Sequence, residues 1–153
     1  MVSLLLLILL LVLGFAQLNA RVAQYRAARE ATSSVQALAL AEAGLEDARV
    51  KLDRDADFPP RGAVDQLVFS YQEDVFDLDN ATRVGSYVVT VDLRWRAPPA
   101  SIVRITSEGQ AGPPGAPTGR RRLTMEVDVA EFRAGAPNPD LFRVLHLEDE
   151  GGF

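Results

Sequence analysis

The segment from Val35 to Leu52, VQALALAEAGLEDARVKL, has a clear helical pattern. Its apolar residues recur at spacings of three or four, which places them on one stripe of an α-helix. The members of this stripe are Val35, Leu38, Ala41, Leu45, Ala48 and Leu52. The helix should end near Arg54, because the prolines at 59 and 60 cannot continue it. The segment therefore predicts a helix that buries one face against another element.

The helical pattern extends back to the N-terminus. No proline occurs before Pro59, and the segment from Asn19 to Arg54 is rich in residues that helices tolerate or favour. Residues 1–18 read MVSLLLLILLLVLGFAQL. One helix over residues 1–54 would be roughly 80 Å long, whereas a domain made from the other residues would be about 26 Å across. We expect the apolar half to protrude and to need lipid or copies of itself.

The composition excludes several functional classes. The chain has 153 residues, a net charge of −5 and no cysteine, so disulfides, thiolate metal sites and thiol nucleophiles are excluded. His146 is the only histidine, and no nucleophile–base pair accompanies it. We expect no enzyme activity and no cofactor. The acidic balance also argues against general nucleic-acid binding.

The first twenty residues contain none of the charges. Two interpretations of this segment are a secretory signal peptide and an ordinary membrane anchor. The length of its apolar helix is close to the thickness of a bilayer's hydrocarbon core. A signal peptide needs a basic start, and nothing before Arg21 is charged. Arg21, Arg26 and Arg29 follow the apolar segment, which by the positive-inside rule would leave the rest of the chain in the cytoplasm. A basic leader removed ahead of Met1 would reverse that preference.

Residues 61–147 predict an antiparallel β domain. Apolar and polar residues alternate around Leu67–Tyr71, Tyr87–Trp95 and Leu123–Val129. Val103 with Ile105 indicates a further strand, which we expect Gly109 to end. Short connections favour a meander of about four strands. We expect a fifth strand at 141–147 and a frayed tail at 148–153.

The sheet should have one apolar face, and the helix stripe is its natural partner. The predicted class is therefore α+β, with residues 21–54 as the amphipathic half of the helix and residues 1–20 as the apolar half. The predicted helix–sheet packing residues are Val35, Leu38, Leu45, Leu52, Val89, Val91, Leu93, Trp95, Leu123, Met125 and Val127.

This arrangement resembles a type IV pilin or pseudopilin. Residues 41–46 read AEAGLE, which is similar to a stretch in a subgroup of minor pilins and related prepilin-like proteins. The resemblance implies that a prepilin peptidase removes a short leader and methylates the new N-terminus, here Met1. Gly14 falls where many pilins carry a glycine. The match covers residues 1–54, and the β domain supports it by architecture alone.

The function implied by the resemblance is that of a structural subunit. The chain would lie in the inner membrane, pass through pilus assembly machinery and polymerise with copies of itself into an extracellular filament. The implied filament core consists of Leu4, Leu5, Leu6, Leu7, Ile8, Leu9, Leu10, Leu11, Val12, Leu13, Gly14 and Phe15. Two alternatives stay open: a minor pseudopilin of a secretion or DNA-uptake machine, and a bitopic anchored binding domain that never polymerises.

Two positions depart from the family pattern. Leu5 stands where most major pilins have a glutamate that pairs with a neighbour's N-terminal amine. Val22 stands where many have a helix-kinking proline. Since some minor tip subunits also lack the glutamate, Leu5 leaves the choice between major and minor subunit open.

Three weaker motifs remain. Asp74, Asp77 and Asp79 supply oxygen ligands that suit calcium, but their order is not that of an EF-hand, and a solvated acidic turn is the preferred interpretation. Asn80 begins the glycosylation sequon Asn-Ala-Thr, without the acidic residue that the common bacterial version requires at position 78. The run at 120–122 is three arginines, which we interpret as a solvated strand start or a salt bridge between subunits.

Overall fold

The computed structural model describes the chain except for residues 1, 56, 60–66, 79–80, 134 and 153, and it leaves undescribed the side chains of residues 2–5, 8, 12, 13 and 16. One helix, α1, comprises Val2–Arg54. The sequence prediction of a single helix ending near Arg54 is confirmed. Lys51 and Arg54 lie in the last turn, where cations are favourable beside the negative end of the helix dipole.

The chain divides into two compact units, Met1–Thr32 and Ser33–Phe153. The boundary falls inside α1, so the second unit contains the last part of the helix together with all the strands. The domains predicted from the sequence were residues 1–54, with their apolar half at 1–20, residues 61–147 and the tail at 148–153.

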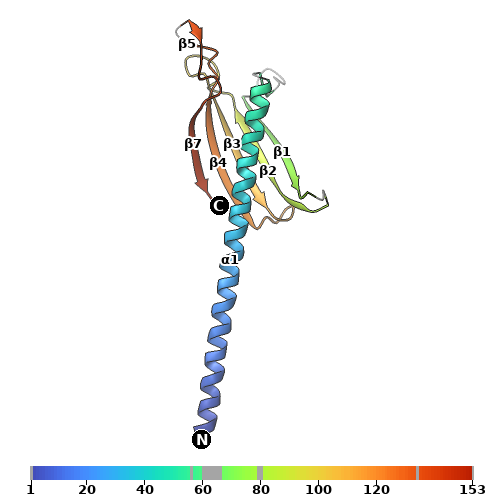
Figure 1. Cartoon of the computed structure of the whole chain (residues 1–153), viewed down its shortest axis with the longest axis vertical. Coiled ribbons are helices and arrows are strands. Elements are labelled where there is room, and N and C mark those ends of the chain that lie inside the picture. Colours follow the sequence, from blue (N-terminus) through green and yellow to red (C-terminus); the bar gives the residue numbers. More distant parts are fainter. Residues whose placement is uncertain (1, 56, 60–66, 79–80, 134, 153) are drawn as a thin grey trace. The chain divides into compact units, whose positions relative to one another are not determined.

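Five strands form one antiparallel sheet in the order β1-β2-β3-β4-β7, and α1 crosses one face of it (Figure 1). The strands are β1 (Val68–Phe76), β2 (Arg83–Asp92), β3 (Ile102–Ala111), β4 (Gly119–Asp128) and β7 (Val144–Gly151). A second, two-stranded sheet pairs β5 (Phe132–Arg133) with β6 (Ala136–Pro137). The α+β class and the antiparallel meander are thus as predicted.

The core lies between α1 and the sheet. Alternation places Val89 and Val91 of β2 on the same face as Ile105 of β3, and the register pairs Val91 with Ile105 directly. The helix contributes a stripe of buried residues to this core: Ala37, Leu40, Ala41, Leu45, Ala48 and Leu52. Of the predicted packing residues, Leu45, Leu52, Val89, Val91, Leu123, Met125 and Val127 are buried, and Leu38 and Leu93 are partly buried against them.

Val35 and Trp95 were wrongly predicted as packing residues, since they are 66% and 54% exposed. Val35 lies two residues before Ala37, which at about 100° per residue turns it almost to the opposite side of the helix. The strand that Trp95 was assigned to ends at Asp92, whose Oδ1 accepts the Arg94 N–H at 3.0 Å. A turn then follows, so the alternation does not reach Trp95.

Glycines let the helix approach the sheet closely. A Cβ on Gly109 would lie 2.0 Å from the Ala37 carbonyl oxygen, and one on Gly119 would lie 2.5 Å from the Ser33 carbonyl oxygen. On the helix side, a Cβ on Gly44 would lie 2.3 Å from Ser107 Oγ. The prediction that Gly109 ends a strand was wrong, because β3 continues to Ala111 and Gly109 is instead the point where the helix backbone passes.

The tail prediction was also wrong. Residues 148–151 belong to β7, where Glu148 pairs with Thr124 and Asp149 with Leu123. Asp149 further accepts a hydrogen bond from Arg121. Fraying was expected because terminal residues are often poorly ordered, but backbone pairing with β4 holds residues 148–151.

Candidate assembly surface

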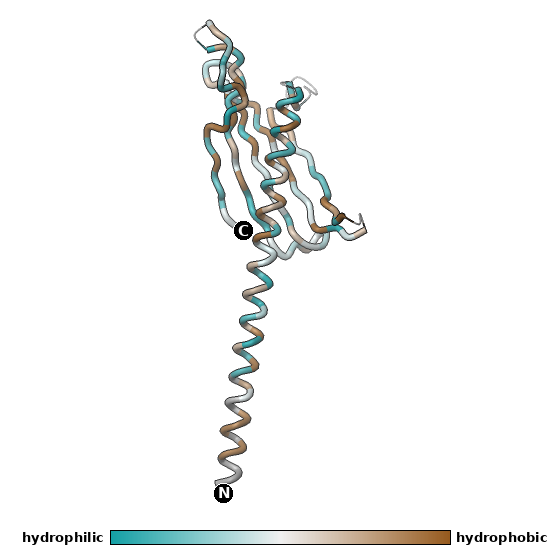
Figure 2. Tube along the Cα trace, in the orientation of Figure 1, coloured by the Kyte–Doolittle hydropathy of each residue, from teal (hydrophilic) through white to brown (hydrophobic). Residues whose placement is uncertain are grey.

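The first unit exposes large apolar side chains. Among the predicted filament-core residues whose side chains are described, Leu7 is 64% and Leu10 68% exposed. The other exposed large apolar residues of this unit are Leu6, Leu9, Leu11, Phe15, Leu18, Val22 and Tyr25. Gly14 lies in the helix with open space around it. Figure 2 shows the apolar character of this part of α1 in brown. We call this group the apolar surface.

Parts of the prediction lie outside the described residues. They are the terminus at Met1 and the side chains of Leu4, Leu5, Ile8, Val12 and Leu13. Within the described residues, no helix contains a stretch both long and apolar enough to cross a membrane.

A polar clamp joins α1 to the first two strands. Lys51 Nζ lies 2.5 Å from Asp47 Oδ2 and 2.7 Å from Glu73 Oε1. Tyr71 donates to Asp47 at 2.8 Å and Tyr87 donates to Glu73 at 2.8 Å. Lys51 also sits 4.0 Å from the centre of the Tyr71 ring. The chain's single lysine thus bridges helix and sheet.

The clamp changes the pKa values of three of its members, Lys51, Tyr71 and Tyr87. Burial alone would lower the pKa of Lys51, but the hydrogen bonds and charges of Asp47 and Glu73 outweigh it and raise that pKa. Burial raises the pKa of Tyr71 well above its ordinary value, and the hydrogen bond to Asp47 adds to this. The pKa of Tyr87 rises for the same reasons, with Glu73 as its acceptor. Lys51 therefore stays protonated and both tyrosines stay neutral at neutral pH, so the clamp is structural.

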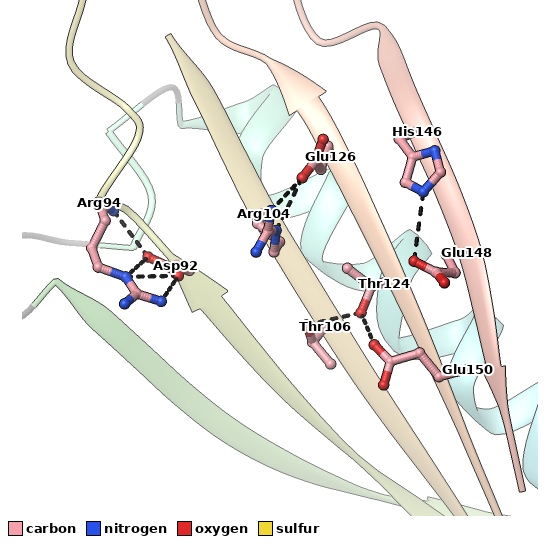
Figure 3. A network of polar contacts seen from close by, with 9 residues as sticks. All are labelled: Asp92, Arg94, Arg104, Thr106, Thr124, Glu126, His146, Glu148 and Glu150. Atoms are coloured by element: carbon pink, nitrogen blue, oxygen red, sulfur yellow. Dashed lines mark hydrogen bonds and ion pairs between the residues drawn. The ribbon is translucent and has the colours of Figure 1, made fainter. Parts of the chain in front are cut away.

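The opposite face of the sheet is polar and holds an open depression of about 400 Å³. Arg104 pairs with Glu126 at 2.7 Å, and Thr124 donates to Glu150 at 2.8 Å (Figure 3). His146 Nε2 lies 3.6 Å from Glu148 Oε2. In the part of the chain that the structure describes, no three acidic, histidine or cysteine side chains are grouped to hold a metal ion.

The acidic loop, which was predicted as a solvated turn with calcium binding as the weaker interpretation, is shorter than expected. Asp74 lies in β1, not in a loop, and Arg83 donates to its Oδ1 at 2.8 and 3.0 Å. Asp77 follows the strand, and its carboxylate accepts the Leu78 N–H at 2.7 Å. Asp79 and the sequon residue Asn80 lie outside the described residues. The calcium interpretation loses Asp74, because that carboxylate already has a cationic partner.

The arginine run at 120–122 opens β4 as predicted. Arg121 pairs with Asp149, and Arg122 pairs with Glu108 at 3.4 Å and Glu150 at 3.6 Å. Two of the three arginines therefore find partners within the chain. Arg120 is exposed.

Ala41 and Ala48 were predicted to lie on the apolar stripe, but sequence reasoning missed that the helix packs closely on the sheet at small residues. Ala37, Ala41, Gly44 and Ala48 form a small-residue stripe with spacings of four, three and four, which signals close packing. The pair Asp47 and Lys51, four residues apart, also signalled a structural ion pair. The sequence did not indicate the packing role of the glycines on β2, β3 and β4, because that role depends on which strands lie next to one another.

A long N-terminal helix that packs on an antiparallel sheet is a pilin-like arrangement. No family model matches the chain, no curated protein matches it, and no solved structure matches it.

Proposed function

We propose that the chain is a structural subunit that polymerises through the apolar surface into a type IV pilus-like filament outside the cell. The observation that carries the proposal is the exposure of Leu7, Leu10 and their apolar neighbours on the described part of α1. An apolar surface of this kind needs a partner. The pilin-like fold and the AEAGLE stretch favour copies of the same chain as that partner.

Burial supplies the mechanism. Each leucine that passes from water into a helix–helix contact contributes about 1.5–3 kcal/mol before entropy costs. Every copy buries its own apolar surface and covers part of its neighbours' surfaces. The interaction is non-covalent and repeats in each copy, so strength grows with the number of contacts. Before assembly, the same segment would reside in the inner membrane, and prepilin peptidase and the assembly machinery would act on the chain there.

A second candidate is a minor pseudopilin that initiates or caps a filament. Leu5 is consistent with this candidate, because some minor tip subunits also lack an acidic residue at that position, but it does not decide between the two subunit types. A membrane-anchored binding domain that never polymerises is the remaining alternative.

The test is the substitution Leu10→Asp, with electron microscopy of material sheared from the cell surface. Burying an unpaired carboxylate in a helix bundle is costly, so we expect the filaments to disappear. The control is Leu78→Asp, the same change at a fully exposed leucine outside α1, which should leave assembly intact. Filaments that persist in Leu10→Asp would contradict the proposed core.

Two further readouts separate the alternatives. If the unmodified chain yields only membrane-bound monomers, the anchored domain is correct and the filament proposal is wrong. If the chain appears at one end of filaments made of another subunit, it is a minor pseudopilin. Intact-mass analysis of the N-terminus should show a methylated Met1; an unmodified initiator methionine would count against the pilin interpretation.

A further inference from the structure

The two compact units carry opposite net charges. Met1–Thr32 contains three arginines and one glutamate, a net charge of +2. Ser33–Phe153 contains 13 basic and 20 acidic residues, a net charge of −7. A polymer of such chains has to arrange these charges between copies.

The positive charge of the first unit is concentrated in one short part of α1. Arg21, Arg26 and Arg29 lie within nine residues, directly after the uncharged segment, and we call them the basic segment. All three side chains are exposed. None forms an ion pair with a residue that the structure describes.

Exposed carboxylates on α1 in the second unit form a matching feature. Glu42, Glu46 and Asp53 are spaced by four and seven residues, so they share one narrow stripe that faces away from the sheet. We call them the acidic stripe. Glu46 pairs with Arg49 at 3.3 Å, a largely exposed contact that exchanges readily. Glu42 and Asp53 form no ion pair with a described residue.

The apolar surface cannot by itself choose how neighbouring helices are offset along their axes. Residues 4–13 are all Leu, Ile or Val, so a shift of one helical turn presents nearly the same surface. The hydrophobic effect is non-directional and does not distinguish such offsets. Charged residues beside an apolar seam do, as they set register and partner choice in coiled coils.

We infer that the basic segment of one copy docks on the acidic stripe of a second copy and so sets the axial offset between them. This inference rests on the proposed function and names the partner surface for it. The apolar surface supplies the attraction, and the charges select one offset.

The test is charge reversal with a reciprocal swap. Arg26→Glu with Arg29→Glu, and separately Glu42→Arg with Glu46→Arg, should each reduce sheared filaments about tenfold or more, since like charges then face each other. The four changes together should restore filaments to within about threefold of the unmodified chain, because the pairing is re-formed with opposite sign. All four positions are exposed, and unchanged thermal unfolding of each variant verifies that the fold is intact.

Two exposed charges elsewhere serve as controls. Arg120→Glu and Glu131→Arg reverse exposed charges that form no ion pair with a described residue. Neither should change the yield of filaments. Equal losses in these controls would mean that assembly responds only to net charge, and the inference would be overturned.

Crosslinking provides a direct measurement, because the chain has no cysteine of its own. Cells that express Arg26→Cys and Glu46→Cys copies together, treated with a short bis-maleimide, should yield a covalent heterodimer from filaments. Replacing the second variant by Glu148→Cys, on the far face of the sheet, should yield none. A crosslink that is equally strong in both mixtures contradicts the proposed contact.

The outcomes separate this inference from the proposed function. If reversal variants assemble normally while Leu10→Asp does not, the charge pairing is wrong and the filament proposal stands. If the swap fails to restore assembly and the Arg26/Arg29 variant instead loses binding to vesicles that contain anionic phospholipid, the basic segment contacts lipid headgroups and the inference is wrong. If the charge-reversal variants and Leu10→Asp all assemble normally, both proposals are wrong.

Discussion

Asp128 is the clearest case of a charged residue that organises its surroundings. Its side chain is 2% exposed. One carboxylate oxygen accepts the Ala130 N–H at 3.0 Å, and the other accepts hydrogen bonds from Asn138 at 3.2 Å and from Arg133. Burial alone would raise the pKa of Asp128, but these hydrogen bonds and the Arg133 charge outweigh it and lower that pKa. The residue therefore anchors the small β5–β6 hairpin to the end of β4.

The lowered pKa gives a pH-dependent prediction. A carboxylate whose pKa is lower in the folded than in the unfolded state stabilises the fold above its unfolded pKa of about 3.9, and this stability is lost as pH falls through the folded pKa. Asp128→Asn should reduce the free energy of unfolding by about 1–3 kcal/mol at pH 7, because a charged acceptor is lost. Denaturant unfolding should show that the difference in free energy of unfolding between Asp128→Asn and the wild type is smaller at pH 2 than at pH 7.

Asp140→Asn is the matched control for this change. Asp140 is about half exposed and pairs with Arg143 at 3.4 Å, so its replacement should cost little at either pH. If the loss of free energy of unfolding in Asp128→Asn were the same at both pH values, the proposed role of the ionised carboxylate would be contradicted.

Ser107 offers the opposite case at the residue scale. Its hydroxyl is buried under the helix and has no hydrogen-bond partner among the residues that the structure describes. An unpaired buried hydroxyl costs free energy, so Ser107→Ala should leave the free energy of unfolding unchanged or raise it by up to about 1 kcal/mol. Thermal or denaturant unfolding measures this change.

Ser70→Ala is the control, because it removes an exposed hydroxyl that forms a hydrogen bond with Thr90 at 2.9 Å. It should be neutral or slightly destabilising. A large loss of free energy of unfolding in Ser107→Ala would contradict the prediction and indicate that the Ser107 hydroxyl has a partner.

At the scale of elements, the contact between α1 and the sheet depends on the absence of side chains. Gly85 on β2, Gly109 on β3 and Gly119 on β4 each leave room that the helix occupies. On the helix, Ala37, Ala41 and Gly44 complete the contact. The polar clamp around Lys51 then fixes the helix above β1 and β2. Close packing and the clamp act on different parts of the same helix, so they should respond to mutation independently.

Gly109→Ala tests the close approach. The added Cβ would lie 2.0 Å from the Ala37 carbonyl oxygen and 2.5 Å from the Ala41 nitrogen, and backbone atoms of a helix cannot rotate away. We expect a loss of about 1–3 kcal/mol or more in the free energy of unfolding, from overpacking. Gly14→Ala makes the same chemical change where nothing lies within 4 Å, and it should not destabilise the second unit. Equal stability of the two variants would mean that the helix backbone does not pack tightly against Gly109.

At the scale of the whole molecule, stability and assembly reside in different parts of the chain. Every buried apolar side chain that the structure describes lies between Ala37 and Val127. The second unit, Ser33–Phe153, therefore contains a complete core.

A fragment that begins at Ser33 should accordingly fold alone. We expect cooperative thermal unfolding with a midpoint within about 3 °C of that of the longer chain, since the core is unchanged. Light scattering should find the fragment monomeric while the longer chain self-associates, because the apolar surface is gone. A fragment that is unfolded, or that associates as strongly as the longer chain, would contradict this separation.

Local patterns were sufficient to predict much of this architecture. The helix, its end before the prolines, the alternating strands and the meander follow from periodicity and chain connection, which act over a few residues. Val35 and Trp95 were misassigned because a pattern cannot say which way a helix is rotated against its sheet or where a turn interrupts a strand.

The long helix, the uncharged first twenty residues and the one-sided sheet follow from the sequence alone, because each depends on residues that are neighbours in the chain. Three other features became clear only in the folded chain: Gly109 lies inside a strand, residues 148–151 pair with β4, and Lys51 bridges Asp47 and Glu73. These features depend on atoms brought together from distant positions, namely helix backbone above a glycine, a strand edge that accepts a partner, and two carboxylates that share one ammonium.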